Sequence, residues 1–425
     1  MAVATRPQPQ DDSEAPTPHA EGAPLRVLVL SERYAPEPNF ITADVAARLA
    51  RDAEVTAVVP HPSYPLGRFY DGVRPWRIAR SREQGVAVRR VPFLPNQALS
   101  IAKRAASYLS YALSATVLAP FLAPRPDVVW VYHGPFTAAL AALWFRFVRR
   151  SRLVITAADL WPESLTAAGV SKPGPLMNAL YAYSRWINRR ADAIICATQG
   201  TADRYHRDGI PRERLHVIPV WIPGVERFAW SPRETAADGF DVVYAGNLGP
   251  SQQLETLIRA GALLQDSPLG VRVHLYGAGA SEQALRDLAR EVGARNVHFH
   301  GRVGPDEAFR ACSEASAQVV SLRRSPEFRF TIPSKLAFSL AAATPILFAL
   351  EAEPREIAIA AGALEFDPDD APSLAARIEE LARLGTGARA ALRQRHRAYY
   401  ERHFSPEPLL DEYARLILQP RATRR

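Results

Sequence analysis

The chain has 425 residues, of which 48% are hydrophobic and 23% charged, so it can form two domains of roughly 200 residues with a buried core in each. It has two cysteines, Cys196 and Cys312, which excludes a disulfide framework and a four-cysteine metal site. Both lie in apolar runs, which predicts buried thiols and a reducing, cytoplasmic setting.

The net charge of +8 is unevenly distributed along the chain. Residues 26–218 carry 26 Lys and Arg against 14 Asp and Glu, whereas residues 219–425 carry 25 against 26. A basic first half indicates attraction to an anionic surface or substrate, and a generally solvated Arg-rich surface is the equal alternative. No segment interleaves basic and aromatic residues in a recognisable module, so nucleic acid is not expected as a partner.

Two segments have a composition that bears on targeting or membrane insertion. Residues 1–25 are rich in Pro, Ala and acidic groups, which predicts a disordered tail rather than a signal peptide. The uncharged run 105–124 contains Pro120, which is expected to end its helix. The 15 residues before that proline rise about 22 Å, short of the roughly 30 Å of a hydrocarbon core, so no span is expected.

Strands and helices alternate through residues 25–220. The strand candidates are short, β-branched and almost continuously apolar, as parallel strands covered on both faces must be. Helical segments such as 43–51 and 137–149 separate them. The strand candidates read LRVLVL, EVTAVVP, VAVRRVPF, DVVWVY, RLVITAAD, DAIICAT and LHVIPV.

The same alternation starts again at residue 240. Helices are expected at 252–264, 281–292 and 335–342, between strand candidates that read FDVVYAG, VRVHLYG, NVHFHG, AQVVSL, TPILFAL and ALEFDP. Between the two series, residues 219–239 contain three prolines and no periodicity, which indicates a linker.

We therefore predict an α/β protein with two Rossmann-like, doubly wound domains that face each other across a cleft. The first covers residues 26–218 and the second residues 240–404. A last helix is expected to begin after Ser405, its N-cap, with Pro406 in the first turn. Residues 405–425 are expected to pack back on the first domain.

Six segments, in this order, resemble glycosyltransferase family 4, especially the branch that transfers amino and deoxy sugars in bacterial polysaccharide assembly. The resemblance implies the GT-B fold and transfer of a hexosyl unit from a nucleotide-diphosphate sugar, with UDP as the expected nucleotide, to a hydroxyl with retention. The implied acceptor is lipid-linked, a polysaccharide or a small molecule. The segments are PSYPLGRFYDG (62–72), DLWPES (159–164), YAGNLGPSQQLETLI (244–258), YGAGASEQAL (276–285), IPSKL (332–336) and AYYERHFS (398–405).

Two glycine-rich turns are candidates for the donor site. YAGNLG ends a strand and opens a helix, which places Gly246, Asn247 and Gly249 at the carboxyl edge of the sheet, where backbone N–H groups can approach a phosphate. YGAGAS repeats this arrangement with Gly277 and Gly279. The alternative for both is a tight turn without a ligand. Relatives often place Arg at position 247 and Lys near position 252 to bind the pyrophosphate, and this chain has Asn and Gln there.

The IPSKL segment predicts a second part of the donor site. Ser334 is expected to be the N-cap of a helix whose free N–H groups, dipole and Lys335 ammonium would stabilise the departing diphosphate. Arg302 and Arg329 are candidates for additional positive charge. Relatives usually carry a glutamate that binds the nucleotide ribose at position 338, and this chain has Phe338, which either faces the donor site or fills core.

On the acceptor side, Asp159 follows a strand and is the candidate to take the acceptor proton or to stabilise an oxocarbenium-like transition state. Glu163 and His133 are expected nearby, and the alternative is that these residues only hold loops or pack.

The sequence has no nucleophile-elbow motif, no phosphate-binding Walker loop and no metal-ligand spacing. The resemblance also implies that no metal or other cofactor is needed. Two other functions stay open: a catalytically impaired GT-B protein that acts as a binding or scaffolding partner, and a nucleotide-sugar epimerase. The basic first domain and its apolar 105–119 helix lead us to expect a cytoplasmic protein bound peripherally to the inner, anionic face of the plasma membrane.

Overall fold

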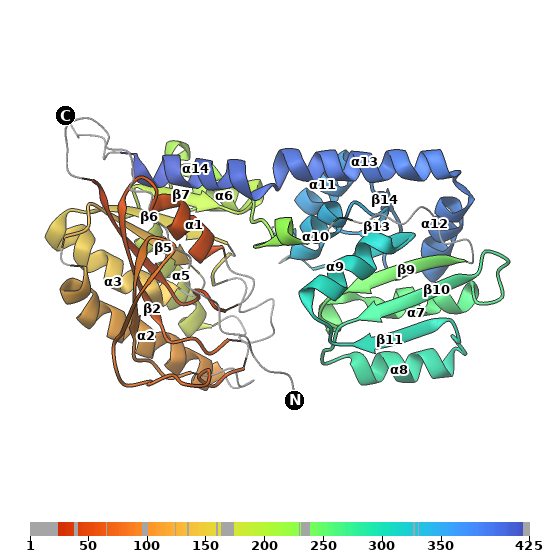
Figure 1. Cartoon of the computed structure of the whole chain (residues 1–425), viewed down its shortest axis with the longest axis horizontal. Coiled ribbons are helices and arrows are strands. Elements are labelled where there is room, and N and C mark those ends of the chain that lie inside the picture. Colours follow the sequence, from red (N-terminus) through yellow and green to blue (C-terminus); the bar gives the residue numbers. More distant parts are fainter. Residues whose placement is uncertain are drawn as a thin grey trace.

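Two parallel sheets organise the computed structural model of the chain (Figure 1). Within the described residues, one sheet has eight strands in the order β3-β4-β2-β1-β5-β6-β7-β8, and the other has six in the order β11-β10-β9-β12-β13-β14. The predicted fold of two Rossmann-like α/β domains is confirmed. The structure describes residues 24–37, 41–64, 66–95, 101–123, 125–133, 136–158, 160–162, 174–228, 230, 239–325, 328–329 and 331–419.

The first sheet is parallel except at one edge, where β3 pairs with β4 in antiparallel register. The sequence did not indicate β3, because its residues ARSRE are charged and largely exposed, and edge strands lack the apolar signal of central ones. The strands of this sheet are β1 (Arg26–Ser31), β2 (Glu54–Pro60), β3 (Ala79–Glu83), β4 (Val86–Val91), β5 (Val128–His133), β6 (Arg152–Ala157), β7 (Ala193–Cys196) and β8 (Leu215–Val217).

The second sheet is parallel throughout its described strands. Central strands of both sheets are buried on both faces, as in β6, all of whose residues are buried. This explains why their sequences are almost continuously apolar rather than alternating. The strands of the second sheet are β9 (Phe240–Ala245), β10 (Val271–Tyr276), β11 (Val297–Gly301), β12 (Ala317–Ser321), β13 (Ile346–Ala349) and β14 (Leu364–Glu365).

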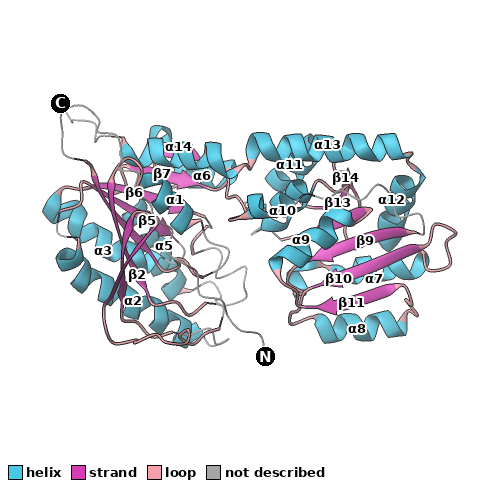
Figure 2. Cartoon of the chain, in the orientation of Figure 1, coloured by secondary structure: helices cyan, strands magenta, loops and turns pink. Residues whose placement is uncertain are grey.

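Helices pack around each sheet (Figure 2) and enclose a core on each of its faces. Those of the first domain are α1 (Thr42–Leu49), α2 (Ile101–Leu122), α3 (Ala139–Trp144), α5 (Pro175–Asn188) and α6 (Gln199–Arg207). Those that follow are α7 (Leu254–Leu263), α8 (Glu282–Glu291), α9 (Pro305–Glu314), α10 (Ser334–Ala342), α11 (Ala352–Ala361), α12 (Ala371–Arg383), α13 (Thr386–His403) and α14 (Pro406–Leu418). Short non-α turns are η1 (Phe136–Ala138), η2 (Phe145–Arg149), η3 (Arg212–Arg214), η4 (Val225–Arg227) and η5 (Pro250–Gln252).

Helix α2 is longer than the sequence led us to expect. Pro120 lies inside the helix, which ends at Leu122, so the prediction that this proline ends the helix is wrong. A proline near the last turn removes one hydrogen bond, and Ala119 and Ala123 on either side of it are buried in the core of the first domain. Among the described helices, α2 is the one with the length and apolar composition of a membrane span. The apolar stretch is Ala105–Leu122, and 28% of it is buried within the protein.

The end of the chain returns to the first domain. Helix α13 lies along the second domain and α14 along the first, at the same edge of the molecule (Figure 1). The Tyr413 ring on α14 packs edge-on against Trp130 and Trp221, with centroids 6.2 and 5.6 Å apart. The Arg152 guanidinium on β6 donates to the carbonyls of Leu416 and Ile417. Ser405 occupies the N-cap position of α14 and Pro406 is its first residue, as predicted, but the Ser405 side chain makes no capping hydrogen bond.

Candidate active site

Three loops leave the carboxyl ends of β9, β10 and β11 and are joined by backbone hydrogen bonds. The Gly246 N–H donates to the Tyr276 carbonyl at 2.8 Å, and the Gly277 N–H donates to the Gly301 carbonyl at 2.7 Å. One step further on, the Leu248 N–H donates to Ala278 at 3.1 Å. The two glycine-rich turns therefore form one continuous edge rather than two separate loops.

The glycines are needed because these loops pack so closely. Gly246 has a φ of +148°, and a Cβ there would lie 2.3 Å from Cε of Lys335. Gly277 has a φ of +143°, and a Cβ there would lie 1.8 Å from the Gly246 carbonyl oxygen. A side chain at either position would displace Lys335 or separate the loops. The glycines at 249 and 279 lie in the same two turns, and a Cβ at Gly279 would lie 2.4 Å from the Leu248 carbonyl oxygen.

Lys335 lies directly beside this edge, in the first turn of α10. Its Nζ donates to Oε1 of Gln252 at 2.6 Å and lies 5.4 Å from the centre of the Tyr244 ring. No carboxylate pairs with it within the described part of the chain. Burial lowers the pKa of the Lys335 ammonium to about 8, because removal from water disfavours the charged form. The result is a poorly hydrated cation without a counter-ion, which favours an anionic ligand.

The start of α10 adds backbone donors next to this ammonium. Ser334 is the first residue of the helix rather than its N-cap, since Pro333 takes the N-cap position and provides no side-chain cap. The expected capping role of Ser334 is therefore wrong. Helix N-termini have N–H groups without intrahelical partners and a positive dipole end. Together with Lys335, they form an arrangement suited to a phosphate or diphosphate.

The sequence did not indicate Gln252 as a site residue, but the structure places it in contact with Lys335. The sequence indicated only that a basic residue of relatives is absent there, whereas the structure shows that the buried Gln252 amide accepts from Lys335. The Tyr244 hydroxyl donates to the Asn247 carbonyl at 2.7 Å, and the Ser321 hydroxyl donates to the Gln252 carbonyl at 2.6 Å. Contacts between residues 83 positions apart leave no signal in a single sequence.

The structure places the two candidate arginines in different surroundings. Arg302 is exposed just beyond β11. Arg329 lines a cavity of about 600 Å³ near the ends of β12 and β13, together with Arg324 and Arg355. The structure does not bring Arg302 into that cavity lining. Arg355 is paired with Glu365, with Nε and Oε1 2.7 Å apart, so the cavity wall carries both signs of charge.

Phe338 lies one turn beyond Lys335 on α10 and is partly exposed. Its ring packs edge-on against Phe309, with centroids 5.4 Å apart, and Phe309 in turn contacts Phe228. The residue therefore covers part of an apolar cluster without being fully enclosed by it. The side chain at position 338 therefore cannot accept hydrogen bonds from a ribose as a glutamate would.

On the acceptor side, Asp159 and Glu163 lie outside the described residues, and His133 is the last residue of β5. The structure identifies another carboxylate at this sheet edge, Glu32, which directly follows β1 and is buried. The Thr137 hydroxyl donates to its Oε1 at 2.6 Å, and its Oε2 has no hydrogen-bond partner within the described residues. Burial raises the pKa of the Glu32 carboxyl to about 8, because removal from water disfavours the charged carboxylate.

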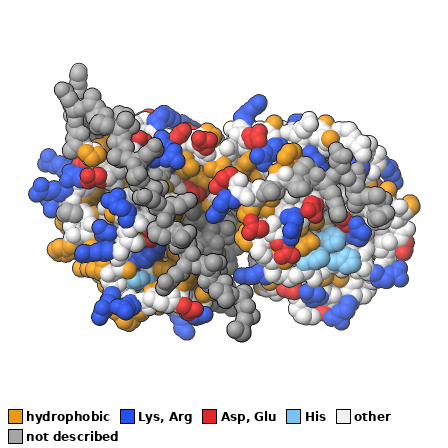
Figure 3. All heavy atoms as spheres, viewed as in Figure 1, with side chains coloured by type: hydrophobic (Ala, Val, Ile, Leu, Met, Phe, Trp, Pro, Cys, Tyr) orange, Lys and Arg blue, Asp and Glu red, His pale blue; other side chains and the backbone are white. Residues whose placement is uncertain are grey.

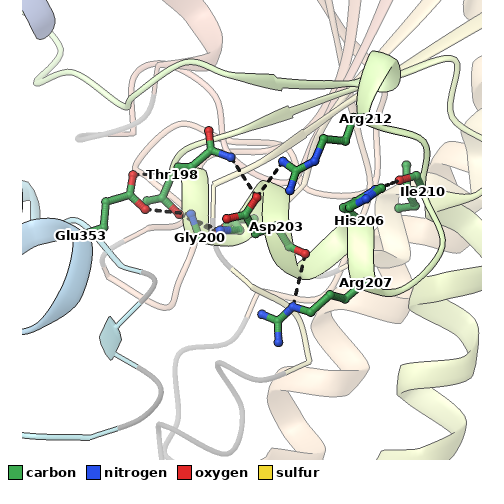
Figure 4. Close-up of polar contacts among 10 residues, drawn as sticks. Thr198, Gly200, Asp203, His206, Arg207, Ile210, Arg212 and Glu353 are labelled. Atoms are coloured by element: carbon green, nitrogen blue, oxygen red, sulfur yellow. Dashed lines mark hydrogen bonds and ion pairs between the residues drawn. The ribbon is translucent and has the colours of Figure 1, made fainter.

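The domains meet at a polar contact that the sequence did not indicate. Glu353, in the first turn of α11, accepts hydrogen bonds from the backbone N–H groups of Gln199 and Gly200, both at 2.8 Å (Figure 4). These groups begin α6 in the other domain. Glu353 also lines an interdomain cavity of about 340 Å³ with residues such as Val217 and Tyr399. A carboxylate of one domain thus occupies a helix N-terminus of the other.

The donor-side arrangement combines glycine-rich loops, a helix start and a desolvated ammonium, which together can bind and neutralise a diphosphate. No group of three or more His, Cys, Asp or Glu residues with the geometry of a metal site occurs within the described ranges.

Known protein families match both halves of the chain. Residues 38–221 match the model of the glycosyl transferase 4-like domain, and residues 239–383 match the model of the glycosyl transferases group 1. The chain is 26% identical over 300 residues to WcaI of Escherichia coli (strain K12), whose name assigns it to colanic acid biosynthesis as a glycosyl transferase; the match covers 65% of this chain and 71% of that protein.

Two solved structures share the fold over almost the whole chain. Sucrose-phosphate synthase from Thermosynechococcus elongatus has a TM-score of 0.69 and 16% identity, with coverage of 93% of this chain and 98% of that one. HepE from Anabaena, solved in complex with UDP-glucose, has a TM-score of 0.65 and 15% identity, with coverage of 92% and 99%. These similarities establish the arrangement of two Rossmann-like domains.

Proposed function

Because the chain belongs to the family 4 type of glycosyltransferases with the GT-B fold, we propose that it transfers a hexose from a UDP-linked donor to a hydroxyl acceptor with retention of the anomeric configuration. The observation that carries this proposal is the Lys335 ammonium at the start of α10, desolvated and beside the glycine-rich edge. The choice of UDP is supported by HepE, a structural neighbour solved with UDP-glucose.

In the proposed reaction the bond between the anomeric carbon and the diphosphate breaks, and a bond from the acceptor oxygen to that carbon forms on the same face. Lys335 and the first-turn N–H groups of α10 stabilise the charge that develops on the departing diphosphate. The acceptor, a lipid-linked sugar, a polysaccharide or a small molecule, binds to the first domain. Asp159 takes the acceptor proton. If Asp159 instead stabilises the positive charge at the anomeric carbon, the acceptor proton passes to the departing diphosphate.

In this reaction α10 and Lys335 neutralise the diphosphate charge in place of a bound metal. Turnover should therefore persist after treatment with EDTA. Loss of turnover that Mg²⁺ or Mn²⁺ restores would contradict this part of the proposal.

The test of the acceptor side is Asp159→Asn, with Glu213→Gln, an exposed carboxylate on η3, as the matched control. General-base contributions are about 10²–10⁴-fold, so Asp159→Asn should lower the transfer rate by that factor while UDP binding, measured by calorimetry, stays within a few-fold. A rate within a few-fold of the wild type would show that Asp159 only anchors a loop.

The second candidate, a catalytically impaired GT-B protein with a scaffolding role, is favoured by one observation: the ribose-binding glutamate of relatives is replaced by Phe338. Donor-hydrolysis and transfer assays with UDP-sugars separate the two functions. A protein that binds UDP yet neither transfers nor hydrolyses any UDP-sugar with any acceptor class supports the scaffold.

A further inference from the structure

The exposed face of α2 carries a row of large apolar side chains. Leu109, Leu113, Val117 and Phe121 have exposed fractions of 56%, 67%, 53% and 81%. They are spaced four residues apart, so they lie along one side of the helix, one above the other. A solvent-facing helix surface in a globular protein is normally polar.

The opposite side of α2 fixes this row at the surface. Tyr111, Ala115 and Ala119 are buried in the core of the first domain, and the Tyr111 hydroxyl donates to the Val58 carbonyl on β2 at 2.8 Å. The helix is therefore part of the domain and cannot turn its apolar row inward. It also cannot become a membrane span without removing these residues from the core.

The apolar surface continues onto the neighbouring segment. Helix α3 packs against α2 and leads directly into η2, where Phe147 and Val148 are 59% and 58% exposed. Beside them the Arg190 guanidinium stacks over Trp186 at 4.0 Å and over Phe147 at 5.9 Å. Aromatic rings paired with arginines at the rim of an apolar surface are typical of protein segments at a membrane–water interface.

The charge around this surface is predominantly positive. Residues 84–158 contain nine Lys or Arg and one acidic residue. That acid, Asp127, is paired with Arg26 at 3.1 Å. Of the basic residues, Lys103, Arg125, Arg149 and Arg150 are exposed. Figure 3 shows hydrophobic and basic side chains interspersed on the side of the first domain where Figure 1 places α2 and α3.

We propose that the surface formed by α2, α3 and η2 binds an anionic lipid bilayer, with α2 lying in the plane of the interface. The apolar row enters the boundary between headgroups and acyl chains, and the basic residues attract the anionic headgroups. The charge excess favours this partner over a second copy of the chain, since two such surfaces would repel each other. The binding does not depend on the proposed chemistry, although it would bring the acceptor domain to lipid-linked acceptors.

The experiment is flotation of the full-length protein with phosphatidylcholine vesicles, with and without phosphatidylglycerol. The protein should float with the anionic vesicles at low salt and be released by high salt, because screening weakens the attraction. The combined substitutions Leu113→Glu and Phe121→Glu should lower the vesicle-bound fraction about ten-fold, since two apolar side chains are lost and two negative charges gained.

The matched control is Leu263→Glu on α7 of the second domain, where the leucine is 59% exposed. It should bind vesicles like the wild type, and thermal unfolding should show that all variants are folded. A second variant, Arg149→Gln with Arg150→Gln, should reduce the salt dependence while keeping the apolar row intact.

Several outcomes would overturn the proposal. These are no flotation with anionic vesicles at low salt, an equal loss for Leu263→Glu, or association that resists both high salt and alkaline carbonate, which would indicate a spanning helix. Self-association that only the α2 variant loses, without any vesicle binding, would make the surface an interface between copies of the chain.

Discussion

Two helix starts, one in each domain, face the region between the domains. They differ in which groups accept hydrogen bonds from their free backbone N–H groups. At α6 the Thr198 hydroxyl accepts from the Thr201 N–H at 3.0 Å. The Glu353 carboxylate accepts from the N–H groups of the two residues before it, Gln199 and Gly200 (Figure 4). At α10 no side chain caps the helix within the described residues, and the first turn carries the cation Lys335.

The same physics therefore serves two purposes. Free N–H groups and a positive dipole end attract an anion at either helix. At α6 that anion is part of the protein and joins the domains, so this helix start is not available to a substrate. At α10 the adjacent Lys335 ammonium cannot accept hydrogen bonds from the free N–H groups and adds a positive charge to them. The attraction for an anion is therefore stronger there, which is why we place the donor diphosphate at α10.

The largest effect should come from Lys335→Met, which removes the ammonium but keeps a side chain of similar length. Loss of one preorganised stabilising group in a site costs about 10²–10³-fold in rate, and we expect a fall of that size in transfer together with weaker UDP binding. Initial rates and calorimetry measure the two. Arg259→Met on the exposed side of α7 is the control, and a Lys335→Met rate within a few-fold of wild type would contradict the assignment of α10.

The next effect concerns the missing ribose contact. Phe338→Glu places a carboxylate one turn beyond Lys335, and each hydrogen bond to a charged group stabilises by about 1.5–3 kcal/mol. UDP should then bind about ten- to a hundred-fold more tightly, as measured by calorimetry. If the variant instead aggregates or unfolds at a much lower temperature, its packing against Phe309 makes Phe338 a core residue and the ribose argument fails.

A third prediction follows from the lowered pKa of Lys335, about 8. Binding uses the charged form, so donor affinity should be complete below this pKa and fall as the pH rises through it. Between about pH 7 and pH 9 the loss should be about ten-fold. UDP-glucose is the suitable ligand, because its diphosphate does not titrate in this range, and Lys335→Met should show a flat profile. A flat profile in the wild type would show that the ammonium does not contact the donor.

The smallest effect is expected at α6. Glu353→Gln keeps the shape of the side chain but removes its charge at a partly exposed site. The contact between the domains should be weakened by about 1 kcal/mol. Glu356→Gln, an exposed residue on the same helix, is the control. Small-angle scattering should show a more open average arrangement for Glu353→Gln alone. No change relative to Glu356→Gln would show that the contact does not hold the domains together.

The sequence predicted the parallel sheets well, because double-sided burial produces apolar runs such as the all-buried β6. It also placed Lys335 and the glycines of both turns at the correct sheet edge. It did not predict the contacts of Gln252 and Glu353, which join residues far apart in the chain. It also missed Glu32, because the burial of a charged residue after a strand depends on the helices above it. Pro120 misled the prediction of α2, since tertiary packing outweighed the local preference for ending a helix.

The return of α14 to the first domain has a consequence for synthesis on the ribosome. Trp130 and Trp221 are produced early and need Tyr413 to cover them, yet residues 406–418 follow the whole second domain in the chain. The first domain must therefore wait, with one apolar face uncovered, until the second has been translated. A nascent chain of this design would need a chaperone during that interval more than one whose domains each close on consecutive residues.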